Sequence, residues 1–209
     1  MKKIATLFSL TMLSLAAFSQ GSGWINLFDG KSLSGWKIGD NAATFTIENG
    51  SIVAHGPVGH LFYDGTAMNH NFKNFEFKTQ VMTTPGSNSG IYFHTEYQQG
   101  GWPAKGYEVQ VNNSHTDWRR TGSLYAVQDV RDTLVKDNVW YTESITVVGK
   151  KVTIKINDKT VVEYTEPENT QRSNDQRGRK ISNGTFALQG HDPKSKVYFK
   201  EIMVRPLPN

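Results

Sequence analysis

Short stretches that alternate apolar and polar residues recur along most of the chain, with turn-forming residues between them. In the segment FEFKTQVM at residues 75–82, Phe75, Phe77 and Val81 fall on one face. A period of two residues is typical of strands with one buried face. By this criterion the sequence predicts strands at residues 44–48, 51–54, 75–82, 90–94, 107–111, 123–127, 141–148, 152–156, 160–164, 184–189 and 197–204.

Several of these segments are joined by turns that are short enough for β-hairpins. Asn49-Gly50 is a strong signal for a two-residue hairpin turn, and Gly149-Lys150 and Asn157-Asp158 separate other expected strands. No long window shows the helical apolar period of about 3.6 residues. We therefore expect one all-β domain, built as a β-sandwich or jelly roll.

The first 19 residues differ from the rest of the chain. Two lysines precede an apolar run at residues 4–18, and Ala17 and Ser19 are small residues at the positions that a signal peptidase recognises. The run is interrupted by Ser and Thr and is shorter than the roughly 20 residues that span a membrane. The sequence predicts a signal peptide at residues 1–19 and an exported domain at residues 20–209, periplasmic or extracellular.

The composition excludes several kinds of site and partner. The chain has 209 residues and no Cys, which excludes disulfides, thiolate metal sites, a cysteine nucleophile and a lipid-anchored cysteine. The formal charge of +4 falls by two without Lys2 and Lys3, which leaves too little to predict nucleic-acid binding. The six His residues show no close ligand spacing, so the sequence predicts no metal and no cofactor.

Three expected strands carry polar and aromatic side chains on the face opposite their apolar residues. One strand of this kind is ordinary in a half-exposed sheet, but three together indicate a polar binding surface if the strands are neighbours. Amide, carboxylate and aromatic groups suit the hydroxyls and the apolar faces of sugars. The residues concerned are Tyr92, His94, Glu108, Gln110, Gln189 and, just beyond its strand, His191.

Residues in the connecting segments extend this candidate site. Asn88 stands before the strand at residues 90–94, and Trp102 and Tyr125 are aromatic residues that either line a site or pack on the core. The basic loop at residues 167–180 is either a solvated surface loop or a lip over an oxygen-rich ligand. Each polar residue also has a structural interpretation, because exposed Glu and half-buried His are common without any chemistry.

Familiar catalytic motifs are absent from the sequence. It contains no G-x-S-x-G elbow, no phosphate-binding loop and no H-E-x-x-H pair. Glu108 has no evident acidic partner on a neighbouring expected strand, so the carboxylate pair of ordinary glycoside hydrolysis is also missing.

Several phrases of the sequence, taken in order, resemble those of one family. They are WINLFDGKSLSGW (24–36), FEF (75–77), NSGI (88–91), GYEVQV (106–111), TGSLY (121–125), LQGH (188–191) and VYFKEI (197–202). In combination they resemble the 3-keto-disaccharide hydrolases, also described as 3-keto-glucoside lyases and hydratases. The resemblance extends over residues 24–207. At two positions the chain departs from the family's pattern, with His94 where Arg is frequent and Asn112 where Asp is frequent.

This resemblance implies a concanavalin A-like jelly-roll sandwich and an exported enzyme that acts on glycosides already oxidised to a ketone at C3. The ketone acidifies the C2 proton, so a base can remove it and the C1 substituent can leave, and addition of water then gives net hydrolysis. We expect Glu108 and His191 to transfer protons, with the acid and base roles open, and His94 to supply positive charge. The expected substrate-binding residues are Asn88, Trp102, Lys105, Gln110, Arg120, Tyr125 and Gln189.

Two other functions are compatible with the same pattern. One is a non-catalytic carbohydrate-binding or adhesion module on the same sandwich, and the other is a purely structural surface domain. The expected partner is a small-molecule carbohydrate, with no nucleic acid and no membrane span. The sequence does not specify the oligomeric state.

Overall fold

The computed structural model describes residues 23–208, so the predicted signal peptide lies outside the described residues. Within this part the chain is built from strands and three short 3₁₀ segments. The strands are β1 (Ile25–Asn26), β2 (Trp36–Ile38), β3 (Phe45–Glu48), β4 (Ser51–Ala54), β5 (Gly59–Tyr63), β6 (Phe75–Thr83), β7 (Ser89–Thr95), β8 (Tyr107–Val111), β9 (Tyr141–Val148), β10 (Lys151–Ile156), β11 (Lys159–Thr165), β12 (Thr185–Gly190) and β13 (Val197–Pro206). The 3₁₀ segments are η1 (Ala42–Thr44), η2 (Ala67–His70) and η3 (Asn174–Gln176).

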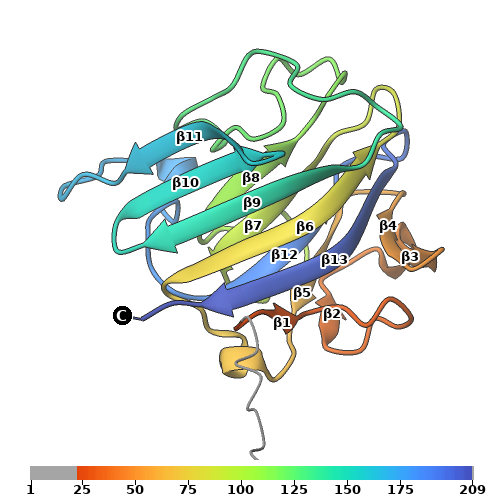
Figure 1. Ribbon diagram of the computed structural model, residues 1–209, viewed down its shortest axis with the longest axis horizontal. Helices are drawn as coiled ribbons and strands as arrows, with labels where there is room; N and C mark the ends of the chain where they lie inside the picture. The colour runs from red at the N-terminus through yellow and green to blue at the C-terminus, as the bar shows by residue number, and fades with distance from the viewer. Residues whose placement is uncertain (1–22, 209) are drawn as a thin grey trace, which may run out of the picture.

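The strands form two antiparallel sheets that lie one over the other (Figure 1). The eight-stranded sheet has the order β11-β10-β9-β6-β13-β4-β3, with β1 paired to β13. The five-stranded sheet has the order β2-β5-β12-β7-β8. This arrangement confirms the predicted all-β sandwich. No helix among residues 23–208 is both long and apolar enough to cross a membrane.

The core lies between the sheets and is rich in aromatic side chains. Phe186 of β12 lies 4.7 Å from Phe77 and 4.9 Å from Phe75, both of β6, between ring centroids. Burial of each such ring contributes about 1.5–3 kcal/mol. Because alternate residues of a strand point to opposite faces, packing Phe186 and Leu188 inward fixes Ala187 and Gln189 on the outer face of the five-stranded sheet.

The predicted hairpin turns have the expected backbone. Asn49 and Gly50 have φ angles of 48° and 75°, and Asn157 and Asp158 have 47° and 65°. These are the left-handed conformations that a two-residue turn between twisted strands requires.

Some strand predictions were wrong or incomplete. Residues 123–127 form a turn rather than a strand, in which Leu124 makes isolated bridges to Val109 and Gln128 and Ala126 has a φ of 58°. The sequence pattern also missed β1, β2 and β5. Strand β5 reads GHLFY and is buried on both faces, so it lacks the alternation on which the prediction relied.

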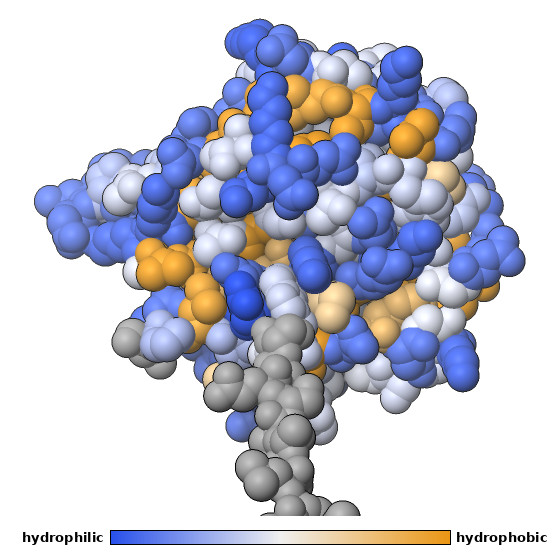
Figure 2. All heavy atoms as spheres, in the orientation of Figure 1, coloured by the Kyte–Doolittle hydropathy of each residue, from blue (hydrophilic) through white to orange (hydrophobic). Residues whose placement is uncertain are grey.

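The outer face of the eight-stranded sheet carries mainly hydrophilic residues, with smaller apolar patches between them (Figure 2). Lys78 and Arg205 lie over the ring of Trp24 on this sheet, and Lys200 lies over Trp140. The charged ends of these side chains thus lie against the faces of the rings, where the π-electrons attract a cation.

Candidate functional site

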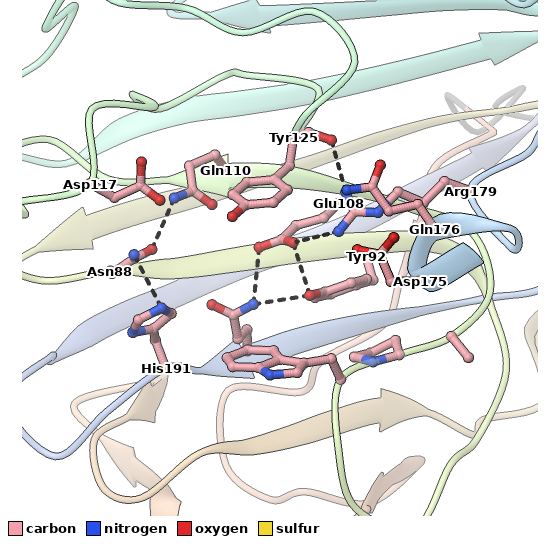
Figure 3. Close-up of a pocket in the computed structure, with 14 residues that line it drawn as sticks. Asn88, Tyr92, Glu108, Gln110, Asp117, Tyr125, Asp175, Gln176, Arg179 and His191 are labelled. Carbon is pink, nitrogen blue, oxygen red and sulfur yellow. Dashed lines mark hydrogen bonds and ion pairs between the residues drawn. The ribbon is translucent and has the colours of Figure 1, made fainter. Parts of the chain in front are cut away.

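A cavity of about 420 Å³ opens on the outer face of the five-stranded sheet. Its volume is in the range of sites for small organic ligands. Its lining combines carboxylate, amide, imidazole, guanidinium and aromatic groups (Figure 3). The lining residues are Asn88, Tyr92, Trp102, Pro103, Ala104, Glu108, Gln110, Asp117, Tyr125, Asp175, Gln176, Arg179, Gln189 and His191.

Strand register brings the central residues of the cavity together. Tyr92 of β7 stands opposite Glu108 of β8 on one side and opposite Ala187 of β12 on the other. Gly90 makes room for the carboxylate, because a Cβ atom at this position would lie 2.5 Å from Oε1 of Glu108. The Glu108 carboxylate therefore requires a glycine at position 90.

Two hydrogen-bond donors and one guanidinium converge on the Glu108 carboxylate, whose residue is only 5% exposed. The Tyr92 hydroxyl donates to Oε2 at 2.9 Å, and the Gln189 amide donates to Oε1 at 3.0 Å. Nη2 of Arg179 lies 3.8 Å from Oε2. Burial raises the pKa of Glu108, and the charge of Arg179 and the two hydrogen bonds partly offset this rise. The result is a carboxylate with a fixed orientation and a strengthened affinity for a proton.

Tyr92 stays protonated in this setting. Burial raises its pKa well above 10.0, and the neighbouring Glu108 adds to the rise. Its hydroxyl also accepts a 3.1 Å hydrogen bond from the amide of Gln189, so the two side chains and Glu108 form a closed triangle of hydrogen bonds.

The loop at residues 167–180 forms one wall of the cavity. Arg179 donates to the backbone carbonyl of Tyr125 at 2.8 Å and lies over the Tyr125 ring. Arg172 anchors the same loop, because its guanidinium donates to the hydroxyls of Tyr107 and Tyr164 and to the carbonyl of Arg179. Of this loop, Asp175, Gln176 and Arg179 line the cavity, while most of its other residues are exposed.

The opposite end of the cavity is organised around Asn88 and His191. The Asn88 amide accepts a hydrogen bond from Gln110 at 3.1 Å, and its nitrogen lies 3.3 Å from Nε2 of His191. Nδ1 of His191 lies 2.9 Å from the Asp192 carboxylate, which also accepts a 2.7 Å bond from the Ser195 hydroxyl. Burial alone would raise the pKa of Asp192, but these hydrogen bonds outweigh burial and lower the pKa to about 2.

An aromatic wall stands beside these polar groups. Trp102 is 51% exposed and lies 5.7 Å from the His191 ring and 5.5 Å from the His60 ring, between centroids. His60 is buried beneath it, and its ring nitrogens have no hydrogen-bond partner among residues 23–208. Burial lowers the pKa of His60 to about 4, with a smaller contribution from His191. An exposed indole beside polar groups is a suitable surface for the apolar face of a sugar.

The cavity brings together most of the residues predicted from the sequence. The predicted residues that line it are Asn88, Trp102, Glu108, Gln110, Tyr125, Gln189 and His191. His94, Lys105 and Arg120 do not line it, and each has a different place in the structure.

His94 lies on the core side of β7, contrary to the expectation from alternation. The pairing of β7 with β12 shifts register between Thr185 and Phe186, which leaves His94 as the extra residue of a bulge with a φ of 55°. Its ring lies 5.6 Å from that of Phe75, between centroids, and its nitrogens bond the carbonyl of Lys73 and the amide of Ser182. His94 therefore braces the backbone rather than facing the cavity.

Arg120 and Lys105 are occupied elsewhere. The Arg120 guanidinium bonds the carbonyls of His115 and Asp117, which stabilises the loop that follows β8. Lys105 pairs with Glu96 at 3.1 Å and lines a separate hollow.

Sequence reasoning missed several members of the site. Alternation placed Tyr92 on the polar face, between the core-facing Ile91 and Phe93, but Tyr92 was not among the residues expected to bind or react with the substrate. Asp117, Arg179 and Asp192 lie in irregular loops, so no periodicity could orient their side chains.

Comparisons with known proteins agree with this architecture. Residues 23–205 match the family described as the 3-keto-alpha-glucoside-1,2-lyase-like domain. A 3-keto-disaccharide hydrolase of Bacteroides thetaiotaomicron is 30% identical over an alignment of 180 residues, and the match covers 73% of this chain. The chain spans 62% of that relative's length.

Solved structures share the fold at low sequence identity. A candidate glycosyl hydrolase of Parabacteroides distasonis has a TM-score of 0.74 at 24% identity and covers 89% of this chain and 94% of its own. The carbohydrate-binding module CBM66 of Bacillus subtilis has a TM-score of 0.59 at 12% identity, covering 82% and 95%. The sandwich is concanavalin-like, as the resemblance implied. Because the family match extends over most of the chain, the protein belongs to the 3-keto-alpha-glucoside-1,2-lyase-like family.

Proposed function

We propose that the cavity cleaves glycosides that carry a ketone at C3 of the sugar, with Glu108 as the group that accepts the C2 proton. The observation that carries this proposal is the state of Glu108, a nearly buried carboxylate that still lines a sugar-sized cavity. A raised pKa makes a carboxylate a stronger base when it is ionised. The family and the name of the Bacteroides relative support a 3-keto-glycoside as the substrate.

The rest of the cavity suits a sugar. The amides of Asn88, Gln110 and Gln189 offer both donors and acceptors to hydroxyl groups. Trp102 and Tyr125 offer flat surfaces to the ring. In this arrangement we assign the C2 proton to Glu108 and place the sugar oxygens toward the His191 end of the cavity.

The reaction balances without any oxidant or reductant. Glu108 takes the C2 proton, and the electron pair of the C2–H bond forms an enolate with the C3 oxygen. The enolate then reforms the C3 carbonyl, a double bond forms between C1 and C2, and the bond from C1 to the aglycone oxygen breaks. That oxygen takes up a proton and departs. Addition of water across C1 and C2 completes a net hydrolysis.

Fixed charges make the proton transfer easier. Arg179 balances the charge of the ionised Glu108 before the reaction, and the Tyr92 hydroxyl keeps one carboxylate oxygen in place. Because these groups are already positioned by the sheet and by the anchored loop, little reorganisation is needed when charge moves to the substrate.

We also propose that the protein acts outside the cytoplasm, because residues 1–19 have the pattern of a signal peptide. Cell fractionation followed by N-terminal sequencing of the mature chain tests this. A product that begins at Gln20 is expected, and a cytoplasmic protein that retains Met1 would exclude export.

The function is tested with an aryl 3-keto-glucoside that releases a coloured aglycone. The wild type should release it, while the corresponding glucoside without the ketone should not react. Glu108→Gln should lose at least about 10²-fold in kcat, the lower range for a removed acid–base group, and should still bind the substrate. The control is Glu96→Gln, which alters an exposed carboxylate outside the cavity.

Two outcomes would contradict this function. If the wild type releases no aglycone from a panel of 3-keto-glycosides but binds sugars, the domain is a binding module. If Glu108→Gln turns over normally, the base is another residue.

A further inference from the structure

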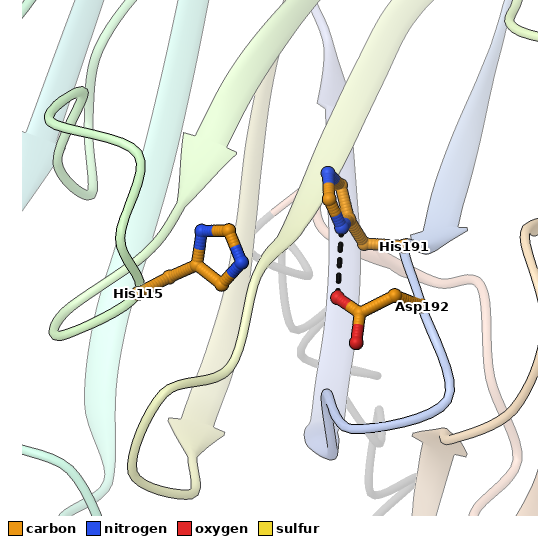
Figure 4. Close-up of side chains that lie close together, drawn as sticks. All are labelled: His115, His191 and Asp192. Carbon is orange, nitrogen blue, oxygen red and sulfur yellow. Dashed lines mark hydrogen bonds and ion pairs between the residues drawn. The ribbon is translucent and has the colours of Figure 1, made fainter.

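Two histidines and an aspartate from distant parts of the sequence converge at the Asn88 end of the cavity (Figure 4). His115 belongs to the loop after β8, and His191 and Asp192 belong to the loop after β12. One potential ligand atom of each residue lies within 4.8 Å of those of the other two. The ring centroids of the two histidines are 5.5 Å apart.

We propose that these three residues bind one divalent transition-metal ion, which holds the oxygens of the substrate. Two imidazoles and a carboxylate form a donor set that suits zinc, manganese, cobalt or iron. A site with three protein ligands keeps coordination positions open for water or substrate, as catalytic metal sites do.

The present geometry is close to that of a metal site. Two ligands about 2.1 Å from an ion and at right angles stand about 3 Å apart. Nδ1 of His191 and Oδ2 of Asp192 are 2.9 Å apart, so an ion can replace the proton that they share. All three side chains are half-buried, and Nδ1 of His115 accepts the backbone N–H of Asp117 at 3.1 Å, which holds its ring beside the other two ligands.

Neighbouring groups hold the ligands in place, as the surroundings of metal sites commonly do. The Ser195 hydroxyl and the amide of Lys194 donate to the Asp192 carboxylate at 2.7 and 2.8 Å. The Asn88 nitrogen lies 3.3 Å from a ring nitrogen of both histidines and keeps the two rings side by side.

The role of the ion rests on the proposed function. A sugar with a ketone at C3 and a hydroxyl at C2 presents two adjacent oxygens that can chelate one ion. Removal of the C2 proton moves negative charge to the C3 oxygen, where a bound cation stabilises it. Glu108 and the ion would thus act on the same carbon and oxygen pair from the two ends of the cavity.

Metal binding is measured directly, without reference to activity. The purified full chain is treated with a chelator, exchanged into metal-free buffer and titrated with Co²⁺, while visible absorption and heat are recorded. We expect one ion per chain with ligand-field bands. His115→Ala and Asp192→Asn should each weaken binding at least tenfold, with folding checked by circular dichroism. The matched control is His70→Ala, which removes an imidazole beside a single carboxylate, that of Asp64.

Each result decides one part of the proposal. Absence of binding at millimolar Co²⁺, or equal binding by wild type and both site variants, overturns the metal site. Loss of binding in His70→Ala places the ion elsewhere. If Co²⁺ binds at the site but its removal leaves kcat on the aryl 3-keto-glucoside unchanged, the role in catalysis is wrong and the site remains. Failure of the wild type to cleave any 3-keto-glycoside would overturn the proposed function without affecting the binding result.

Discussion

The hydroxyl of Tyr92 donates a 2.9 Å hydrogen bond to Oε2 of Glu108, across the pairing of β7 with β8. The two residues are direct cross-strand neighbours, so the contact is set by the sheet and not by a flexible loop. A base whose orientation is fixed before the substrate arrives needs no rearrangement during proton transfer.

Substitution Tyr92→Phe tests the importance of this orientation. It removes one donor to the carboxylate and preserves the ring that packs beside Phe62. A hydrogen bond to a charged group contributes about 1.5–3 kcal/mol, so kcat should fall about 10- to 100-fold. Steady-state kinetics on the aryl 3-keto-glucoside measure the effect. Tyr97→Phe, which changes an exposed ring outside the cavity, should leave kcat unchanged. An unchanged kcat in Tyr92→Phe would show that Glu108 does not depend on this contact.

Arg172 positions the wall of the cavity without lining it. Its guanidinium donates to Tyr107, Tyr164 and the carbonyl of Arg179 at 2.8–3.1 Å. Arg172→Met should loosen the loop and raise KM about tenfold, with a smaller effect on kcat, because each lost hydrogen bond contributes about 1 kcal/mol. The control is Arg177→Met in the same loop, whose guanidinium bonds the exposed side chain of Asn174 and no other residue of the described part of the chain. Equal effects of both substitutions would contradict a specific anchor.

Much of the site could be predicted because strand alternation carries information about direction. Once Tyr107 and Val109 are assigned to the core, Glu108 and Gln110 must point the other way, and the same reasoning places Gln189. The outer face of the sheet was therefore predictable residue by residue wherever a strand is regular.

The prediction failed where the backbone leaves this regularity. His94 points into the core at a β-bulge, and no residue type in the sequence predicts that bulge. The guanidinium of Arg120 instead bonds a backbone carbonyl of its own loop. His115 and His191 meet only because β8 and β12 end at the same side of the sheet, a relationship that depends on strand order and not on sequence spacing. Strand order in a sandwich is set by packing between distant segments, which a single sequence does not display.

His94 should affect stability and its pH dependence rather than turnover. Burial lowers its pKa to about 4 from an ordinary value of 6.5. Between these values the unfolded chain binds a proton that the folded chain does not, so His94 makes stability fall as the pH drops from 6.5 to 4, by roughly 3 kcal/mol.

The substitution His94→Gln removes this contribution and keeps groups that can bond Lys73 and Ser182. Urea unfolding at pH 7, 5.5 and 4 should show a flatter pH dependence than in the wild type, with kcat at pH 7 preserved. A loss of turnover in a variant that is folded at pH 7 would restore His94 as a candidate for catalysis.

Glu143 should have the opposite effect on stability. Its side chain is fully buried in β9 and its two carboxylate oxygens have no hydrogen-bond partner among residues 23–208. Burial raises its pKa well above 4.5, so the folded chain retains a proton that the unfolded chain loses. Stability therefore falls as the pH rises above 4.5. Glu143→Leu should raise the free energy of unfolding at pH 7 by about 1–3 kcal/mol, and the gain should shrink toward pH 4.

Urea unfolding of both proteins across this range measures the difference. Glu163→Gln is the control, because it removes an exposed carboxylate that pairs with Lys151 and should give no stabilisation at pH 7. If Glu143→Leu instead lowers the free energy of unfolding by the same amount at every pH, the Glu143 carboxyl group makes a stabilising contact in the folded chain. A pH-dependent gain would show that this protein keeps an unpaired acid in its core.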